Sequence, residues 1–365
     1  MDYRRADRAR SMRPGRVEEG WVGMRIAVIG DGEAERAWAD WVRESPDHVL
    51  IATGDVDEVL SATGFDAVVV GGPIPDRAEA LRRASVEGLA VVCLHPPGAD
   101  ALAYYHAAAN VETAGGVVVP DLPMRLHPGL APLRSAIVDG SLGEFRSLRQ
   151  VVPAVVGEDL VRVSFAQSID VLRSLLGEFQ TLTASGDPEG TEPAHDLVVR
   201  LRAEGGRLAE LRIAPGEFAS LGVMGSEGAC DLDFDASWDP HAAILESLQV
   251  PGGRGSTLLD GIRAMELTEA VERSLRRGRT IDLHREPMGE EARFKSLMTT
   301  AGCLVLLGAV MLFVAASAGR ALGFEGAVYL AYLIPPGLVA FLALQFLRPR
   351  AATPDEPPAL EGPTD

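Results

Sequence analysis

Short apolar runs alternate with helical stretches from Met24 to Val119, and this alternation restricts the fold more than any other feature of the chain. Strands are expected at residues 24–30, 48–52, 65–70, 89–94 and 116–119, with helices at 33–44, 77–87 and 100–110 and a brief helical stretch after residue 55. Strands that alternate with helices form a parallel sheet covered by helices on both faces. The third strand follows the second after a brief link, so one strand and helix of a complete six-stranded unit are expected to be missing or merged.

A glycine turn separates the first strand from its helix. Gly30 and Gly32 allow the backbone to approach a diphosphate, and the start of the helix offers free amides and a positive dipole. The pattern predicts an NAD or NADP site in a truncated Rossmann-like domain. Glu35 replaces the third glycine of the fingerprint, however, and Asp31 and Glu33 add negative charge. Each carboxylate would cost on the order of 1 to 4 kcal/mol at about 4 Å from a diphosphate, so binding is expected to be weak or absent.

Asp55 ends the second expected strand, 25 residues after Gly30. In dinucleotide-binding folds, an acid near this spacing accepts a hydrogen bond from the adenosine ribose. The alternative is a turn aspartate that bonds its own backbone. Both interpretations of Asp55 stay open at this point.

The net charge of −18 argues against nucleic acid as a partner, because polyphosphates bind to concentrated basic surfaces. The arginine-rich start, residues 1–23, is predicted to be a disordered basic tail, and the proline-rich and acidic residues 351–365 a disordered acidic tail. Cys93, Cys230 and Cys303 lie far apart, so neither a disulfide framework nor a metal site is expected.

Two uncharged runs, residues 297–318 and 326–347, are long enough to cross a membrane. Each has 22 residues, which as a helix reach about 33 Å against a hydrocarbon core of about 30 Å. Pro335 and Pro336 in the second run predict a kink or break there, with a re-entrant segment as the alternative. We therefore expect two transmembrane helices that anchor the chain or contact another membrane protein.

The basic residues around these runs predict their orientation. Arg293 and Lys295 precede the first run, Arg348 and Arg350 follow the second, and the connecting loop contains only Arg320. Because basic residues stay on the cytoplasmic side, the soluble domain and both termini should face the cytosol from the cytoplasmic membrane.

Several segments resemble, in order, the landmarks of the Gfo/Idh/MocA oxidoreductase family. They are residues 65–72 (FDAVVVGG), 87–96 (EGLAVVCLHP), 125–128 (RLHP), 139–144 (DGSLGE), 168–173 (SIDVLR), 176–178 (LGE), 225–228 (GSEG) and 261–283 (GIRAMELTEAVERSLRRGRTIDL). The resemblance implies a Rossmann-like domain at 24–120 that binds NAD or NADP. It also implies a second α/β domain at 121–284, whose open and mostly antiparallel sheet forms the site for a sugar or polyol.

Two catalytic landmarks of the family are changed in this chain. Leu94-His95-Pro96 stands where the family has Glu-Lys-Pro, and Gln167 stands where it has a histidine, whereas Asp170 is kept. The chain contains a single lysine, Lys295, beside the first apolar run. His95 could replace the missing acid and base, since its ordinary pKa is near 6.5, or it could simply end a strand. Asp170 could bond a substrate hydroxyl or belong to the polar face of its helix.

Three functions agree with these features. The first is a membrane-tethered NAD- or NADP-dependent oxidoreductase that acts on a sugar or polyol, with His95, Asp170 and Gln167 as catalytic candidates. Its cofactor-binding candidates are Gly30, Gly32, Asp55, Gly71, Pro73 and His95. The second, which the changed landmarks favour, is a protein that has lost hydride transfer and serves as a binding or scaffold module beside a membrane complex. The third is a subunit of a transporter or envelope assembly, and a homo-oligomer is compatible with all three.

Overall fold

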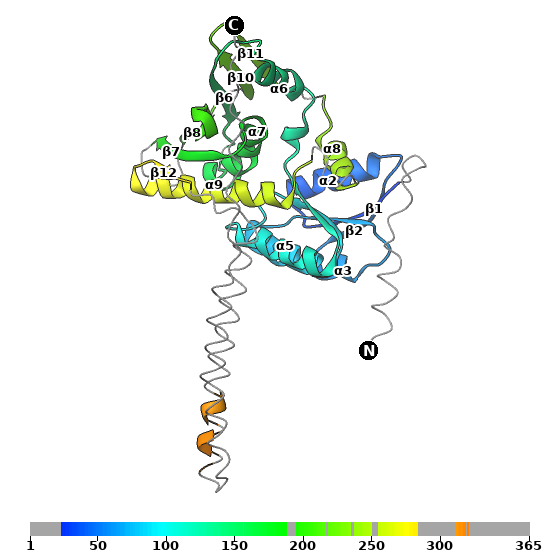
Figure 1. Ribbon diagram of the computed structural model, residues 1–365. Coiled ribbons are helices and arrows are strands. Elements are labelled where there is room, and N and C mark those ends of the chain that lie inside the picture. Colours follow the sequence, from blue (N-terminus) through cyan, green and yellow to red (C-terminus); the bar gives the residue numbers. More distant parts are fainter. Residues whose placement is uncertain are drawn as a thin grey trace, which may run out of the picture. The chain divides into compact units, whose positions relative to one another are not determined.

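The structure, a computed structural model, describes residues 23–155, 157–187, 195–216, 218–234, 237–249, 255–283, 311–314, 316–318 and 320. By its internal contacts the chain forms two compact units, Met1–His284 and Arg285–Asp365. All labelled helices and strands belong to the first unit (Figure 1).

The first five strands form a parallel sheet in the order β2-β1-β3-β4-β5. The strands are β1 (Arg25–Ile29), β2 (Val49–Gly54), β3 (Ala67–Val70), β4 (Ala90–Leu94) and β5 (Val117–Asp121). A complete dinucleotide-binding sheet has the order 3-2-1-4-5-6, and removal of its third strand leaves the order found here. The expected Rossmann-like parallel sheet is therefore confirmed, and so is the shortened link after the second strand.

Helices cover both faces of this sheet. They are α2 (Glu33–Glu44), α3 (Val56–Ser61), α4 (Ile74–Val86) and α5 (Leu102–Ala114), joined by α8 (Pro240–Gln249) and α9 (Leu258–Arg277) from the far end of the unit. Trp38 of α2 and Ile244 of α8 are buried in one cluster against one face. Leu81, Tyr104 and Met265, from α4, α5 and α9, are buried against the other face. The second half of the unit thus completes the core of the first.

Seven further strands form a second, mixed sheet in the order β11-β10-β6-β9-β8-β7-β12. They are β6 (Phe145–Pro153), β7 (Phe179–Asp187), β8 (Asp196–Ala203), β9 (Leu208–Ala214), β10 (Ser220–Gly225), β11 (Ala229–Asp233) and β12 (Ile281–Asp282). The β6 and β9 pair is parallel and the other pairs are antiparallel, so the expected mostly antiparallel sheet is confirmed.

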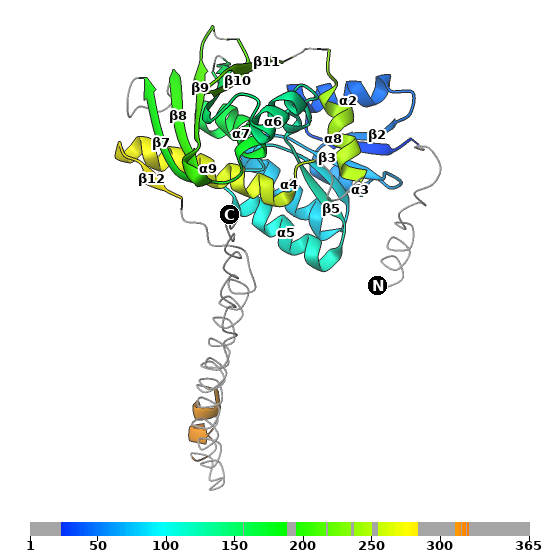
Figure 2. The same ribbon diagram turned by 45° about the horizontal axis from the view of Figure 1, so that its top comes forward.

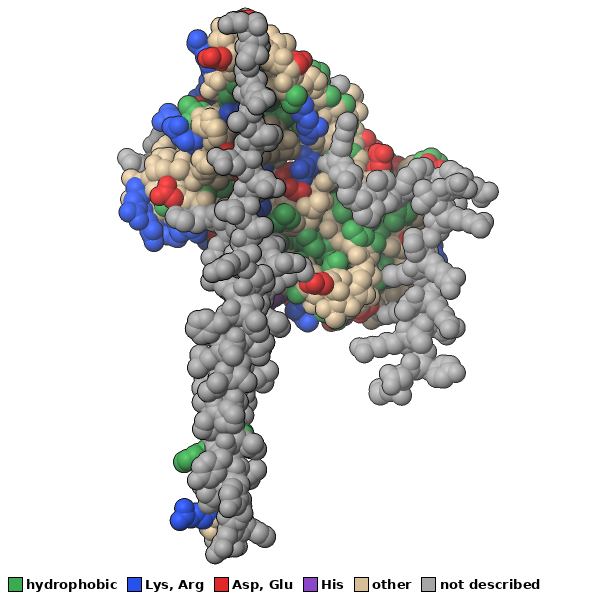
Figure 3. All heavy atoms as spheres, in the orientation of Figure 1, with side chains coloured by type: hydrophobic (Ala, Val, Ile, Leu, Met, Phe, Trp, Pro, Cys, Tyr) green, Lys and Arg blue, Asp and Glu red, His purple; other side chains and the backbone are tan. Residues whose placement is uncertain are grey.

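One face of the second sheet is buried and the other is polar. Apolar residues of β8 and β9 alternate inward and pack with α7 (Ala166–Leu176) and α9. Both helices lie on one side of this sheet (Figure 2). On the opposite face Glu210 pairs with Arg149 and Arg200. In the space-filling view, basic side chains gather mostly over the half of the unit that contains this sheet (Figure 3). On the face in view, the basic side chains are therefore unevenly distributed.

Four short elements complete the described unit. They are η1 (Pro123–Leu126), α6 (Leu130–Asp139), η2 (Leu160–Phe165) and η3 (Glu204–Gly206). The η2 segment is a π-helix that leads directly into α7, and the Asp159 side chain accepts hydrogen bonds from the Val161 and Arg162 amides. Such π-helical turns occur frequently beside functional sites.

Within the described residues, no helix has both the length and the apolar composition needed to cross a membrane. The two expected spans, 297–318 and 326–347, lie outside the described residues apart from 311–314 and 316–318. The expected tails lie outside them as well, apart from Gly23. The division of the soluble part at residue 120 stays a prediction.

Candidate functional site

The first sheet reverses its strand order between β1 and β3, and ligands of doubly wound sheets bind at such a switch point, outside the carboxyl ends of the strands. Three loops meet there: residues 30–32 after β1, 71–73 after β3 and 95–96 after β4. We call them the edge loops. Gly30 lies so close to the second loop that a Cβ built on it would be 2.5 Å from the Gly72 nitrogen. The fold therefore brings together the predicted cofactor residues Gly30, Gly32 and Gly71.

Glu35 occupies the space over these glycines. It lies in the first turn of α2, only 4% of its surface is exposed, and its Oε1 accepts a hydrogen bond of 2.5 Å from the Gly72 amide. A Cβ built on Gly32 or on Gly71 would collide with the Glu35 carboxylate. The second glycine of the fingerprint is needed so that the backbone can approach a diphosphate. With Glu35 in this position, the turn does not fit a diphosphate.

Arg77 stands behind this carboxylate and joins the edge loops. Its Nη2 lies 3.8 Å from Glu35 Oε1 and donates to the Gly72 carbonyl at 2.8 Å. Its Nη1 donates to the carbonyls of Leu94, at 3.3 Å, and Pro96, at 2.7 Å. The sequence analysis missed Arg77, although an arginine three residues into a helix that follows a glycine pair is the signal that could have pointed to it.

Two other predicted cofactor residues have roles in local structure. The Asp55 side chain accepts a hydrogen bond of 2.8 Å from the Glu58 amide and caps the start of α3. Pro73 precedes α4, and its carbonyl accepts from the Asp76 and Arg77 amides. Capping explains an aspartate at position 55 without a ligand. The role of Asp55 in ribose binding stays a prediction.

His95 is buried at the end of β4, with 3% of its surface exposed. Its Nδ1 lies 3.1 Å from the Tyr104 hydroxyl, and the two rings stack with centroids 5.8 Å apart. Burial, together with the positive charge of Arg77, lowers the pKa of His95 to about 3. The ring is therefore neutral and enclosed at neutral pH. This geometry does not favour proton transfer by His95. The catalytic role of His95 stays a prediction.

Gln167 lies on α7 and reaches the third edge loop. Its Nε2 donates a hydrogen bond of 3.1 Å to the backbone carbonyl of His95. The structure thus brings His95 and Gln167 together, as the resemblance implies for the two changed positions. Their contact is between a side chain and a backbone group, and an amide cannot exchange a proton with a substrate at ordinary pH.

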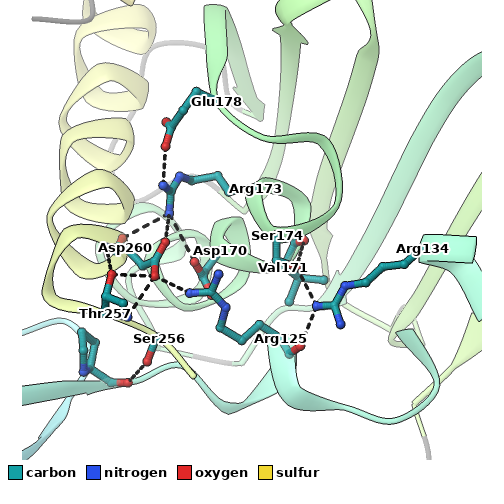
Figure 4. A network of polar contacts seen from close by, with 11 residues as sticks. Arg125, Arg134, Asp170, Val171, Arg173, Ser174, Glu178, Ser256, Thr257 and Asp260 are labelled. Atoms are coloured by element: carbon teal, nitrogen blue, oxygen red, sulfur yellow. Dashed lines mark hydrogen bonds and ion pairs between the residues drawn. The ribbon is translucent and has the colours of Figure 1, made fainter. Parts of the chain in front are cut away.

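Asp170, one turn further along α7, is part of a buried charged network (Figure 4). Asp170 Oδ2 lies 3.4 Å from Arg125 Nε, and its Oδ1 lies 3.3 Å from Arg173 Nη1. Both arginines also pair with Asp260 at the start of α9, at 2.6 Å from Arg125 and 3.3 Å from Arg173. Arg173 Nη2 reaches Glu178 at 2.6 Å. The network joins η1, α7 and α9.

Burial controls the charge of Asp170. With 1% of its surface exposed, desolvation raises the pKa of Asp170 to about 6, while Arg125 and Arg173 act in the opposite direction. For Asp260 burial also raises the pKa, but Arg125 and the hydrogen bonds from Thr257 lower it below its usual range. Asp170 is therefore held by internal partners. Its predicted contact with a substrate hydroxyl stays a prediction. Within the described ranges, no group of three His, Cys, Asp or Glu side chains could hold a metal ion.

Comparison with known proteins gives a consistent result for the fold. No family model matches the chain. An inositol 2-dehydrogenase from Streptomyces avermitilis is 28% identical over 239 residues, which cover 62% of this chain and 68% of the relative.

The solved structures with a similar fold include the following two. A putative myo-inositol dehydrogenase from Sinorhizobium meliloti superposes with a TM-score of 0.61 at 21% identity, over 72% of this chain and all of the other. The scyllo-inositol dehydrogenase from Lactobacillus casei, with bound NAD(H) and scyllo-inositol, superposes with a TM-score of 0.59 at 16% identity, over 71% of this chain and 99% of the other. The chain therefore has the oxidoreductase fold of the Gfo/Idh/MocA-type inositol dehydrogenases.

Proposed function

We propose that this protein is a non-catalytic, membrane-anchored member of the inositol dehydrogenase fold that serves as a binding or scaffold module. The observation that carries the proposal is the enclosure of His95 against Tyr104, with a pKa of about 3. His95 stands where the resembling family has its lysine, and Gln167 stands where it has its histidine. Neither position offers a group that could carry a proton at neutral pH.

Hydride transfer at a carbinol carbon needs such a group, because the hydroxyl proton must leave or return in the same reaction. A histidine with a pKa of about 3 is a very weak base at pH 7, and burial keeps it from a substrate. Asp170 is already shared between Arg125 and Arg173. Asp170 therefore holds α7 to η1 through Arg125.

The anchoring part of the proposal rests on the two uncharged runs at 297–318 and 326–347. Helices of this length suit a bilayer, and the flanking arginines and Lys295 favour a cytosolic position for residues 24–283. A folded domain held at the cytoplasmic membrane is placed to bind another membrane protein. NAD binding by this chain is expected to be weak or absent.

Turnover measurements test the loss of catalysis. The full-length chain in detergent should produce no change in absorbance at 340 nm with NAD or NADP and either myo-inositol or scyllo-inositol. Turnover that disappears in His95→Ala would contradict the proposal and assign the proton carrier. His106→Ala is a matched control, because His106 lies on the exposed side of α5.

Purification from the native membrane tests the scaffold role. A membrane protein should co-purify with the full-length chain and with His95→Ala, and it should be lost when residues 297–347 are deleted. Co-purification that survives this deletion would place the contact on the soluble part. The complete absence of any membrane protein would contradict the scaffold role.

An active NAD- or NADP-dependent oxidoreductase on a sugar or polyol is the second candidate. Its support is the 28% identity with an inositol 2-dehydrogenase and the NAD(H) bound to a protein of the same fold. NAD is therefore a plausible ligand of this chain. Micromolar NADH binding by the wild-type protein, with inositol-dependent turnover, would favour this candidate over the first.

A further inference from the structure

We propose that the Glu35 carboxylate is a built-in substitute for the diphosphate of a dinucleotide, held at the switch point by Gly72 and Arg77. This role deepens the non-catalytic function proposed above and rests on it, because an internal anion at this place is useful only to a protein that works without the cofactor.

The Glu35 side chain occupies the space over two glycines of the edge loops. The three heavy atoms nearest to a Cβ built on Gly32 all belong to the Glu35 side chain, and the same is true for Gly71. These two glycines come from different edge loops, so the carboxylate lies between the loops. A glycine at position 32 leaves room for an anion over the backbone. In this protein the anion that fills that room is part of the chain.

The contacts of Glu35 are those that a bound anion would need. A backbone amide, from Gly72, donates to Oε1 at 2.5 Å, and the Arg77 guanidinium lies 3.8 Å from the same oxygen. Amides and guanidinium groups are the usual donors to phosphate oxygens. Gly72 has a φ of +92°, a conformation that favours glycine, and its amide donates to Glu35.

Glu35 and Arg77 together also connect the edge loops, as a bound cofactor would. Glu35 belongs to the helix after β1, whereas Arg77 donates to the carbonyls of Gly72, Leu94 and Pro96 in the loops after β3 and β4. The three edge loops are thus joined through one buried ion pair. A dinucleotide that lies across the same edge would join them in the enzymes of this fold.

Substitution of Glu35 tests the proposal directly. In the full-length chain in detergent, Glu35→Ala removes the carboxylate and supplies a residue that the third position of the fingerprint accepts. NADH fluorescence titration should show weak or absent binding to the wild-type protein, and binding to Glu35→Ala that is at least about tenfold tighter. Far-ultraviolet circular dichroism and a thermal melt confirm that the variant is folded.

Two matched variants separate occupancy from charge. Glu33→Ala removes a carboxylate from the same helical turn at an exposed position, and Glu35→Gln removes the charge but keeps the volume. Neither should gain binding. If Glu33→Ala or Glu35→Gln binds NADH as tightly as Glu35→Ala, simple repulsion explains the weak binding and the proposal is overturned.

Glu35→Ala leaves Arg77 buried without its carboxylate, which could prevent folding. The double variant Glu35→Ala/Arg77→Leu removes both charges and keeps the test available. A folded Glu35→Ala variant that gains no affinity overturns the proposal, and so does a wild-type protein that binds NADH as tightly as this variant. If only the double variant folds, a double variant without a gain in affinity has the same consequence.

The result also distinguishes this inference from the proposed function. Wild-type NADH binding without turnover would overturn the role of Glu35 and leave the non-catalytic function intact. Wild-type turnover with an inositol would overturn the non-catalytic function. Tighter binding in Glu35→Ala without turnover supports both.

Discussion

Gln167 donates a hydrogen bond from its side-chain amide to the backbone carbonyl of His95, at 3.1 Å. This bond ties α7 to the loop after β4, where a proton carrier would have to meet a substrate. The residue at the family's histidine position thus has a structural use in this chain. Replacement of Gln167 should therefore lower the free energy of unfolding and leave turnover unchanged.

Gln167→His restores the residue type that the resembling family has at this position. The variant should still show no NAD- or NADP-dependent turnover with an inositol, because Glu35 fills the space over Gly32. Loss of the bond to His95 should lower the free energy of unfolding by about 0.5 to 1.5 kcal/mol. Absorbance at 340 nm and urea unfolding measure the two effects. Turnover in this single variant would show that the dinucleotide site is open.

His95 should make the stability depend on pH. Its pKa is about 3 in the folded protein and near 6.5 in the unfolded chain, so the unfolded chain binds a proton first as the pH falls. The contribution of the neutral His95 to the free energy of unfolding is fully present above about pH 6.5. It is lost as the pH falls toward 3, by at most about 1.4 kcal/mol per pH unit. Between pH 7.5 and 5.5, the free energy of unfolding, measured with urea, should fall less steeply with decreasing pH for His95→Gln than for the wild type. Equal slopes would mean that the histidine is accessible to protons.

Arg173 should be important for stability because three carboxylates depend on it. Its guanidinium contacts Asp170, Glu178 and Asp260 in a buried position. Arg173→Met should lower the free energy of unfolding by about 3 to 5 kcal/mol, since buried carboxylates lose a partner. Arg200→Ala is the control: Arg200 pairs with Glu210 but its side chain is 75% exposed, so the loss should be below about 1 kcal/mol. A urea titration that gives the same loss of unfolding free energy for Arg173→Met and Arg200→Ala would contradict the importance of the network.

Asp55 offers a test of capping against ribose binding. Asp55→Ala removes the bond to the Glu58 amide and should cost about 0.5 to 2 kcal/mol, whereas Asp55→Asn keeps an equally good cap and should cost almost nothing. Thermal melts compare the two variants. If Asp55 bound a ribose, Asp55→Asn would weaken NADH affinity in a binding assay while the stability stayed unchanged.

Local patterns were sufficient to predict the architecture. The apolar runs that became β1, β3 and β4 are each followed by helix-forming segments, and that order permits few arrangements besides a parallel sheet. The short link after β2 likewise indicated the missing strand. These features depend on neighbours in the sequence, so they can be recognised without knowledge of the packing.

The site was less predictable because its partners are distant in the sequence. The position of Glu35 at the third glycine was evident, and so was its conflict with a diphosphate. Its bond to Gly72 and its pairing with Arg77 depend on how β3 lies beside β1, and no local pattern reports this. His95 is similar: its low pKa results from burial in the core and from the positive charge of Arg77, and both depend on the assembled helices.

The packing of α8 against the first sheet has a consequence for synthesis. Ile244, Leu245 and Leu248 bury the same apolar face as Trp38, yet the ribosome makes them only after the whole of β1 to β11. A nascent chain that ends at β5 would leave exposed the part of that face that α8 covers. The amino-terminal half should therefore wait for the later helices, or for a chaperone, before it reaches its final form during translation.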